Sequence, residues 1–454
     1  MRGAGGRAGL RVRLPRAATE AARCLGLADP LHRHAAEELR SVLEPNAERL
    51  RATLEAFSSA DVGGTPRGGV SRPAASDADK AVRDRFAGMA GDLGLAVRVD
   101  DAGNMYARRE GSRPDAEPVL VGSHLDTVVP GGRFDGILGV GLALETVALL
   151  NDADTRTARP VEVVNWTGEE GARFPPAMLG SGVVTGAWDV EYAHSRTDAA
   201  GARLGDELSR IGYLGERGNR LGSFFASLEA HIEQGTQLEE ADADVGVVSF
   251  IEPVRWCTTR VTGRGGHAGG PGPDGRAEAM VAAARMVAAA RDASLDSGDF
   301  KTTVGTMRVE PGSNNVIPHE VTFNLDIRSQ DDDTLGQRLA RVTERFDEIA
   351  RQEGVEVAVE QAWALSGPPF DASVQQLLAR VAGERGVRWA PVRGHIGHDS
   401  LHLASMGPAA MLFTRTQGGL SHCEGEFAPW ESVLTTATVY ANAALALADA
   451  ETLT

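Results

Sequence analysis

Several side chains that can bind a metal ion or move a proton stand directly after apolar runs of the sequence. His124 and Asp126 follow the run PVLVG, and Asp135 comes shortly afterwards in GGRFDG. Glu169 and Glu170 form an adjacent pair after the next apolar run, PVEVVNW. Adjacent carboxylates at the end of a buried strand repel one another, and a nearby cation relieves that repulsion. This pattern favours a metal site.

Two more imidazoles come from distant segments, His231 in LEAHIEQG and His422 in GGLSHCEGE. A mixed set of imidazoles and carboxylates suits borderline divalent ions such as Zn²⁺ or Mn²⁺. Taken singly, these residues have ordinary interpretations, because a lone histidine is often a hydrogen-bonded core residue and a Glu-Glu pair is often a solvated strand end. Only the joint pattern favours a metal hydrolase.

The elements around these residues alternate between strand and helix patterns. PVLVGSHLD and PVEVVNWTGEEG are compact apolar runs that end in polar residues, and the helical run GILGVGLALETVALL lies between them. This order predicts an α/β fold with a mostly parallel sheet. Ligand sites in such sheets lie at the carboxyl ends of the strands, where the polar residues stand.

A different order runs from 246 to 361, where strand, helix, strand, strand, helix and strand follow one another. This βαββαβ order predicts an inserted ferredoxin-like domain, for which the family resemblance described below implies a role as a lid and dimerisation module. Residues 31–245 and 362–454 then form the catalytic domain. Residues 1–30 are rich in arginine and are expected to be a disordered extension, with organellar targeting as the less favoured alternative.

Composition narrows the class of protein further. A chain of 454 residues suggests two or three domains at roughly 150 residues each. Its net charge of -17 disfavours a nucleic-acid partner, and no apolar run is long enough to predict a membrane span. Three scattered cysteines favour a reducing compartment, so we expect a cytoplasmic protein.

Nine motifs, taken in order, resemble those of the hydantoinase/carbamoylase branch of the M20 metallopeptidase superfamily. They are GSHLDTV, GGRFDGILGV, WTGEEGARF, LGSG, LEAHIEQG, GHAG with Arg276, NNVIPHEVTFNLDIRS, GHDS and GGLSHCEGE. The likeness runs from about Leu31 to Ala448. The branch includes N-carbamoyl-L-amino-acid, allantoate and ureidoglycolate amidohydrolases and β-ureidopropionases.

The resemblance implies a site for two divalent metal ions, zinc or manganese, with cobalt and nickel as alternatives. In that arrangement Asp135 bridges the ions, His124 and His231 bind one, and Glu170 and His422 bind the other. Glu169 would be the general base, and Asp126 would be the carboxylate that orients the imidazole of His124.

The resemblance also implies how the substrate is recognised. Arg328 and Asn315 would hold a substrate carboxylate, for which a guanidinium fork is well suited, although a structural salt bridge is the alternative for Arg328. His267 would polarise the scissile carbonyl from the neighbouring subunit of a homodimer. Gln234 and His398 would line the pocket.

The chain departs from the family pattern at three places. The loop after GHAG contains glycine and proline at 269–273 where relatives carry threonines and a Pro-Met pair, Gly168 replaces an acid or amide, and Gly182 replaces an arginine. These changes leave the implied metal ligands intact but affect loops from which substrate contacts are expected.

The implied activity is hydrolysis of an N-carbamoyl-L-amino acid to the amino acid, carbon dioxide and ammonia. Allantoate amidohydrolase is the nearest alternative, and ureidoglycolate or β-ureidopropionate hydrolysis would use the same machinery. An aminoacylase, a dipeptidase and a non-catalytic binding protein of the same fold are more distant alternatives.

Overall fold

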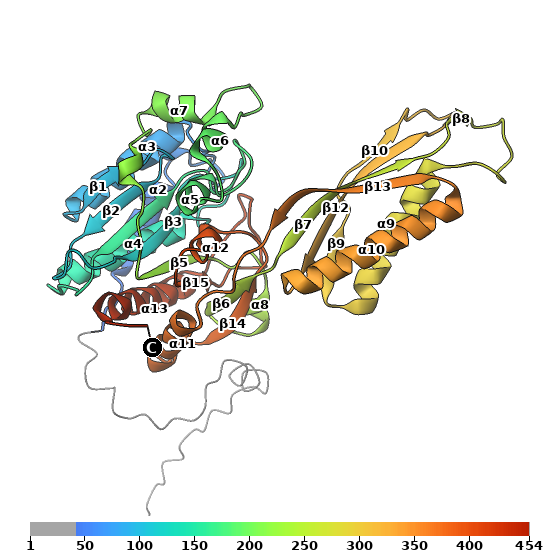
Figure 1. Ribbon diagram of the computed structural model, residues 1–454. Coiled ribbons are helices and arrows are strands. Elements are labelled where there is room, and N and C mark those ends of the chain that lie inside the picture. Colours follow the sequence, from blue (N-terminus) through green and yellow to red (C-terminus); the bar gives the residue numbers. More distant parts are fainter. Residues whose placement is uncertain (1–41, 454) are drawn as a thin grey trace, which may run out of the picture. The chain divides into compact units, whose positions relative to one another are not determined.

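The computed structural model describes residues 42–453, so the expectations for residues 1–30 and for a helix beginning near Leu31 lie outside the described residues. The chain forms two compact units. The first comprises residues up to Ser249, Phe370–Val392 and residues from His398 onward, and the second comprises Phe250–Pro369 and Arg393–Gly397. Figure 1 labels the elements of both units.

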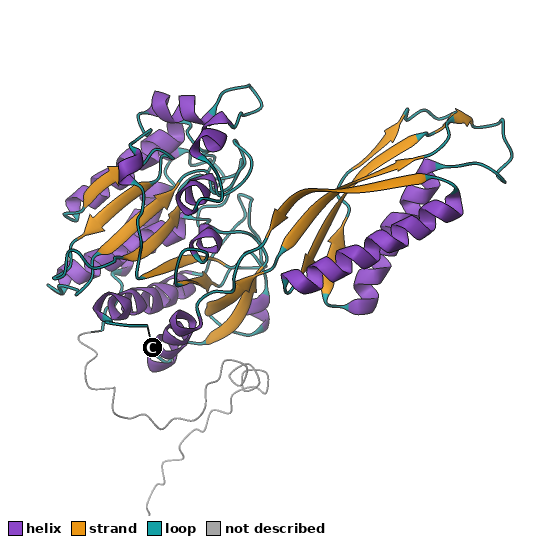
Figure 2. Cartoon of the chain, viewed as in Figure 1, coloured by secondary structure: helices purple, strands orange, loops and turns teal. Residues whose placement is uncertain are grey.

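The first unit contains an eight-stranded sheet (Figure 2). Its strands, in spatial order, are β1 (Ala96–Val99), β2 (Met105–Arg109), β4 (Val161–Trp166), β3 (Val119–His124), β5 (Ala226–Ile232), β15 (Ala409–Thr414), β6 (Val245–Ile251) and β14 (Trp389–Gly394). The four central strands are parallel to one another. They are buried along their whole length, which explains why most of their residues are apolar.

The expectation of a mostly parallel sheet was wrong, because the sheet is mixed. Strand β1 pairs antiparallel with β2, β2 with β4, and β6 with β15. The connection between β1 and β2 is a tight turn in which Asp100 Oδ1 accepts hydrogen bonds from the main-chain N–H groups of Ala102 and Asn104, both at 2.9 Å. Such a short connection can join only antiparallel strands.

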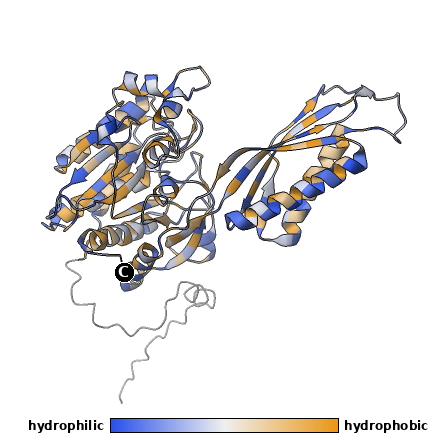
Figure 3. Ribbon diagram, viewed as in Figure 1, coloured by the Kyte–Doolittle hydropathy of each residue, from blue (hydrophilic) through white to orange (hydrophobic). Residues whose placement is uncertain are grey.

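Helices pack against this sheet and against one another. The most buried is α4 (Ile137–Asp152), in which every residue from Ile137 to Leu150 is buried, and it contacts β3, α2 and α13. Figure 3 colours the chain by hydropathy. The other helices are α2 (Ala47–Phe57), α3 (Asp77–Asp92), α5 (Leu179–Thr185), α6 (Val190–Ser195), α7 (Leu204–Ile211), α8 (Gln237–Glu240), α11 (Ala372–Glu384), α12 (Asp399–Leu403) and α13 (Trp430–Asp449), with 3-10 turns at Ala60–Val62 and Arg217–Asn219.

The second unit has the element order β-α-β-β-α-β, with its second strand divided in two. Its sheet has the order β10 (Met307–Glu310), β12 (Glu320–Ser329), β7 (Val254–Thr262) and β13 (Glu356–Leu365), and β9 (Phe300–Thr303) also pairs with β12. Helices α9 (Ala279–Ser297) and α10 (Asp332–Glu353) cover one face, onto which Val321, Phe323 and Leu325 of β12 pack. A separate ribbon joins β8 (Gly266–His267) to β11 (Val316–Ile317).

The limits of this second unit differ from the expected range of 246–361. Strand β13 continues to Leu365, and the short segment 393–397 joins the unit from a later part of the chain. A sequence pattern does not show this return of the chain, because the segment carries no helix or strand period of its own. Among the described residues, no helix is long and apolar enough to cross a membrane.

Candidate metal centre

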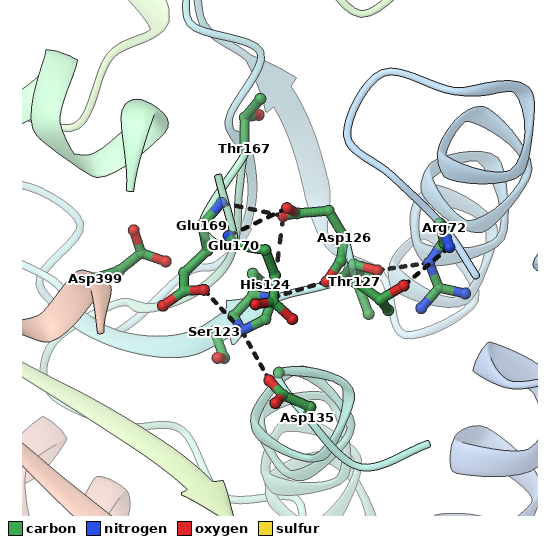
Figure 4. A network of polar contacts seen from close by, with 12 residues as sticks. Arg72, Ser123, His124, Asp126, Thr127, Asp135, Thr167, Glu169, Glu170 and Asp399 are labelled. Carbon is green, nitrogen blue, oxygen red and sulfur yellow. Dashed lines mark hydrogen bonds and ion pairs between the residues drawn. The ribbon is translucent and has the colours of Figure 1, made fainter. Parts of the chain in front are cut away.

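Neighbouring parallel strands of the first unit bring the polar residues to one edge of its sheet. His124 is the last residue of β3, Glu169 and Glu170 follow β4, and His231 is near the end of β5. Asp135 lies just before α4, and it lies beside His124 in Figure 4. The carboxyl ends of parallel strands meet at one edge, so these residues converge although they are distant in sequence.

The first group of potential ligands consists of His124, Asp135 and His231, all of them buried. Asp135 Oδ1 lies 3.5 Å from Nε2 of His124 and 3.1 Å from Nε2 of His231. One carboxylate oxygen therefore faces two imidazole nitrogens, and the three ligand atoms surround a common point.

Main-chain carbonyls fix the orientation of both imidazoles. Nδ1 of His124 lies 3.0 Å from the carbonyl oxygen of Asp126, and Nδ1 of His231 lies 3.0 Å from that of Ile232. Because a carbonyl only accepts hydrogen bonds, each Nδ1 carries a proton and each Nε2 is the nitrogen that faces Asp135; Nε2 of His231 also lies 3.1 Å from the main-chain nitrogen of Gly136. Nε2 of His124 is buried without a hydrogen-bond partner, which is the condition that a bound cation would satisfy.

The second group consists of Asp135, Glu170 and His422. Nε2 of His422 lies 3.5 Å from Asp135 Oδ2 and 3.4 Å from Glu170 Oε2. His422 has a left-handed backbone (φ 54°) and a side chain that is 43% exposed. Asp135 thus belongs to both groups, one oxygen facing each, which is the arrangement expected of a bridging ligand.

The acidic residues of the site are buried close to one another, and this shifts their pKa values. Burial, with repulsion from Glu170 and Asp399, raises the pKa of Glu169 well above its usual value. Burial and Asp135 do the same to the pKa of Glu170. Burial lowers the pKa of His124, but Glu169 and Asp135 outweigh it and raise that pKa well above normal. The cluster attracts positive charge, and the donor set fits divalent metal ions.

Asp126 positions the glutamate pair. Its carboxylate accepts hydrogen bonds from the main-chain N–H groups of Glu169 at 3.2 Å and Glu170 at 3.4 Å, whereas its distance to Nδ1 of His124 is 4.0 Å. The imidazole of His124 is therefore held by the carbonyl of Asp126 and not by its carboxylate, which differs from the role that the resemblance implies.

A buried arginine, Arg72, contacts the main chain at Leu125, which lies between His124 and Asp126. The guanidinium of Arg72 donates to the carbonyls of Leu125 at 2.5 Å, Phe57 at 2.8 Å and Val62 at 2.7 Å. This fully buried side chain therefore ties Leu125 to the main chain at Phe57 and Val62.

Glu426 and Ser421 were not identified from the sequence, although both stand in the motif that contains His422. Glu426 Oε1 accepts hydrogen bonds from the main-chain N–H groups of Phe134 at 3.0 Å and Asp135 at 3.1 Å. The Ser421 hydroxyl lies 3.1 Å from Asp135 Oδ2 and from Glu426 Oε2. A Cβ atom at Gly132 would lie 1.9 Å from the carboxyl carbon of Glu426, so this packing requires a glycine there.

Gln234 and His398, the expected pocket residues of the first unit, both lie at the cluster. Gln234 Nε2 donates to Asp135 Oδ2 at 2.9 Å. The ring of His398 lies 4.3 Å from that of His231, and its Nδ1 lies 3.9 Å from Glu169 Oε1. Burial and His231 lower the pKa of His398 well below its usual value, so this imidazole is neutral. Neither of its nitrogens has a hydrogen-bond partner among the described residues.

The other expected substrate residues belong to the second unit. Arg328 donates to both oxygens of Asp326, each at 2.9 Å, and to the carbonyl of His395 at 2.6 Å. Pairing of β8 with β11 brings the segments of His267 and Asn315 together, and the N–H of Ala268 donates to the Asn315 carbonyl at 2.9 Å. Nδ1 of the exposed His267 accepts from Gly269 N–H at 3.1 Å, which leaves its Nε2–H free to donate.

The space beside Gly182, where relatives are expected to carry an arginine, is filled by an aromatic ring. A Cβ atom at this position would lie 2.1 Å from Cδ1 of the Trp188 ring. The main-chain N–H of Trp188 donates to the Gly182 carbonyl at 3.0 Å. A larger residue at 182 would therefore displace the indole.

The chain is similar to known amidohydrolases over most of its length. The sequence model that represents peptidase family M20/M25/M40 matches residues 120–446 of this chain. The chain is 38% identical over 382 residues to an N-carbamoyl-L-amino-acid amidohydrolase of Rhizobium meliloti, covering 84% of this chain and 91% of that protein. It is 30% identical to an allantoate amidohydrolase of Bacillus subtilis, covering 81% and 90%. A crystal structure of a hydantoinase/carbamoylase family amidase from Burkholderia multivorans superposes with a TM-score of 0.83 at 40% identity, covering 90% and 99%.

The chain therefore belongs to peptidase family M20/M25/M40 and, within it, to the hydantoinase/carbamoylase branch. It is a hydrolase of the amidohydrolase type.

Proposed function

We propose that the protein is a metal-dependent amidohydrolase that converts N-carbamoyl-L-amino acids and water to the amino acid, carbon dioxide and ammonia. The observation that carries this proposal is the pair of ligand groups that share Asp135, with Glu169 beside them but in neither group. The similarity to the Rhizobium meliloti N-carbamoyl-L-amino-acid amidohydrolase supports the substrate class.

In this proposal His124 and His231 bind one divalent ion, Glu170 and His422 bind a second, and Asp135 bridges the two. Zinc or manganese suits the ligands best, and cobalt and nickel accept the same set. The ions would supply Lewis acidity to the scissile carbonyl and to the attacking water. Glu426, Ser421 and Asp126 would hold the ligands and the glutamate pair in place.

Glu169 is proposed as the general base. Its Oε2 lies 3.6 Å from Nε2 of His124, so the carboxylate borders the first ligand group. A buried carboxylate with a raised pKa is a stronger base than one in water. Glu169 would take a proton from the attacking water and pass it to the leaving nitrogen.

Arg328 and Asn315 are proposed to bind the substrate carboxylate. The guanidinium of Arg328 uses Nε, one proton of Nη1 and one of Nη2 in the contacts described, and each of the two Nη atoms has a second proton. His267, as a donor through Nε2–H, would stabilise the oxyanion from the neighbouring subunit of a homodimer. Gln234 and His398 would line the pocket, and the second unit would act as the lid and dimerisation module.

Allantoate is the second candidate substrate, supported by the similarity to the Bacillus subtilis allantoate amidohydrolase. It also carries a carboxylate, so Arg328 would serve the same purpose, and a second ureido group would fill the space of the amino-acid side chain.

Product analysis on a substrate panel tests the proposal. Protein loaded with Mn²⁺ or Zn²⁺ is incubated with N-carbamoyl-L-amino acids, allantoate, N-carbamoyl-β-alanine and an N-acetyl-L-amino acid. Equal amounts of ammonia and free amino acid from the N-carbamoyl-L-amino acids support it. Preferential ammonia release from allantoate would support the second candidate, and turnover of only the N-acetyl compound would indicate an aminoacylase.

A further inference from the structure

Two tryptophans, one exposed and one partly buried, lie on the face of the second unit's sheet that the helices do not cover. Trp256 on β7 and Trp363 on β13 are opposite each other in the strand register, with ring centroids 4.6 Å apart and planes inclined at 43°. Trp256 is 46% exposed. The exposed Trp256 ring and the partly buried Trp363 ring beside it form an apolar platform on this face of the sheet.

The platform is linked directly to Arg328. Nε1 of Trp256 donates to Asp326 Oδ2 at 2.7 Å, and the same oxygen accepts from Nη2 of Arg328 at 2.9 Å. Asp326 stands opposite Trp256 in the register, and Arg328 follows two positions later on the same strand face. The indole edge and the guanidinium are therefore separated by one carboxylate oxygen.

The indole nitrogen of Trp256 and Nη2 of Arg328 both lie within hydrogen-bond distance of Asp326 Oδ2. A carboxylate on the remaining protons of Arg328 and an apolar group on the indole rings would therefore be neighbours, and the apolar group would be removed from water. Asp326 occupies one edge of the guanidinium and so leaves the other edge for a second carboxylate.

We propose that Trp256 and Trp363 form the side-chain subsite of the enzyme and select carboxylate substrates with large apolar or aromatic side chains. This inference rests on the proposed function, because it takes Arg328 to be the group that binds the substrate carboxylate. Asp326 then acts as a positioning residue that orients both the guanidinium and the Trp256 ring.

Trp363→Ala tests the subsite, since Trp363 meets Trp256 through its ring and leaves the Trp256–Asp326–Arg328 contacts in place. The readout is the ratio of kcat/KM for N-carbamoyl-L-phenylalanine to that for N-carbamoylglycine. We expect this ratio to fall by at least about tenfold, because loss of an apolar wall discriminates by this amount or more. Met307→Ala, which removes another exposed apolar side chain of the same unit, is the control and should leave the ratio unchanged.

An unchanged ratio in Trp363→Ala would overturn the inference. A change of mass in solution, measured by light scattering, would also overturn it, since the tryptophans would then serve a subunit interface. If wild-type protein hydrolyses neither substrate, the proposed function fails on its own, and calorimetric titration with N-carbamoyl-L-phenylalanine decides the inference separately. Binding that weakens at least about tenfold in Trp363→Ala supports the subsite, and absence of binding contradicts it.

Discussion

Glu169 and Glu170 are adjacent in the chain, yet their carboxylates face different partners. Glu170 Oε2 lies 3.4 Å from His422, within a ligand group, whereas Glu169 lies beside His124 and His398 and belongs to neither group. The two residues form a matched pair for separating metal binding from proton transfer.

Glu169→Gln should lower kcat by about 10²- to 10⁴-fold, the usual contribution of a general base, while the protein keeps its metal. Glu170→Gln should lose bound metal, because the amide removes a charged ligand. Metal content by mass spectrometry and kcat are measured on both variants. Loss of metal from Glu169→Gln would make Glu169 a ligand and the division of roles wrong.

Glu426 should control metal affinity through Asp135 without touching the metal. Glu426→Gln replaces an acceptor of two main-chain N–H groups and of the Ser421 hydroxyl. We expect metal affinity to weaken by about 10- to 100-fold, as is typical when a group supporting a ligand is changed. Competition with a chelator measures the affinity. An affinity equal to that of wild type would show that Asp135 is held adequately by other contacts.

At the level of single residues, the sequence was informative about side-chain type and uninformative about main-chain contacts. The motifs indicated His124, Asp135 and His231, and the structure brings these residues together. The sequence did not show that a main-chain carbonyl orients His124, or that Glu426 accepts a hydrogen bond from the N–H of Asp135. Both contacts depend on the path of the backbone.

Among the elements, the strand ends that carry the site could be predicted and the direction of the outer strands could not. The buried runs of β3 and β4 are mostly apolar, and a helix between them indicates a parallel pair. Strands β6 and β14 carry no such signal, because their neighbours come from other parts of the chain.

Helix α12, which follows His398, contains a histidine whose burial makes the fold sensitive to acid. Burial lowers the pKa of His402 from 6.5 to about 4. Between these two pH values the unfolded chain takes up a proton that the folded chain does not, so the free energy of unfolding falls as pH falls. This single group can account for up to about 3 kcal/mol.

His402→Asn removes that titration and keeps a polar group beside the Ser181 hydroxyl, which lies 3.1 Å from Nδ1 of His402 and donates to Asp399. Urea denaturation of both proteins near neutral pH and near the lower pKa gives the comparison. The difference in unfolding free energy should shift in favour of the variant by roughly 2 to 3 kcal/mol at the acidic pH. Parallel pH dependence in the two proteins would show that His402 titrates normally.

At the level of the whole molecule, the chemistry and the proposed carboxylate contact belong to different compact units. The βαββαβ pattern indicated the second unit, but not that residues 393–397 return to it and supply the His395 carbonyl to Arg328. This division predicts that changes in the second unit affect substrate affinity and leave metal content alone.

Arg328→Ala should raise KM for carboxylate substrates by about 10- to 100-fold, the cost of one charge-assisted contact, with two metal ions still bound. Arg260→Ala is the control, since this arginine is exposed on the same sheet and pairs only loosely with Glu320 at 3.5 Å. Steady-state kinetics and metal analysis distinguish the two. A KM unaffected by Arg328→Ala would leave the arginine with a purely structural role.

In the proposed mechanism, two divalent ions held around Asp135 are required for amide hydrolysis. Chelator-stripped protein is titrated with Mn²⁺ or Zn²⁺ while ammonia release from an N-carbamoyl-L-amino acid is followed. We predict no release without metal, recovery that is complete at two equivalents per subunit, and no recovery in Asp135→Asn. Full activity in stripped protein would show that no metal ion is required. Recovery that is complete at one equivalent would show that the second ion is not required.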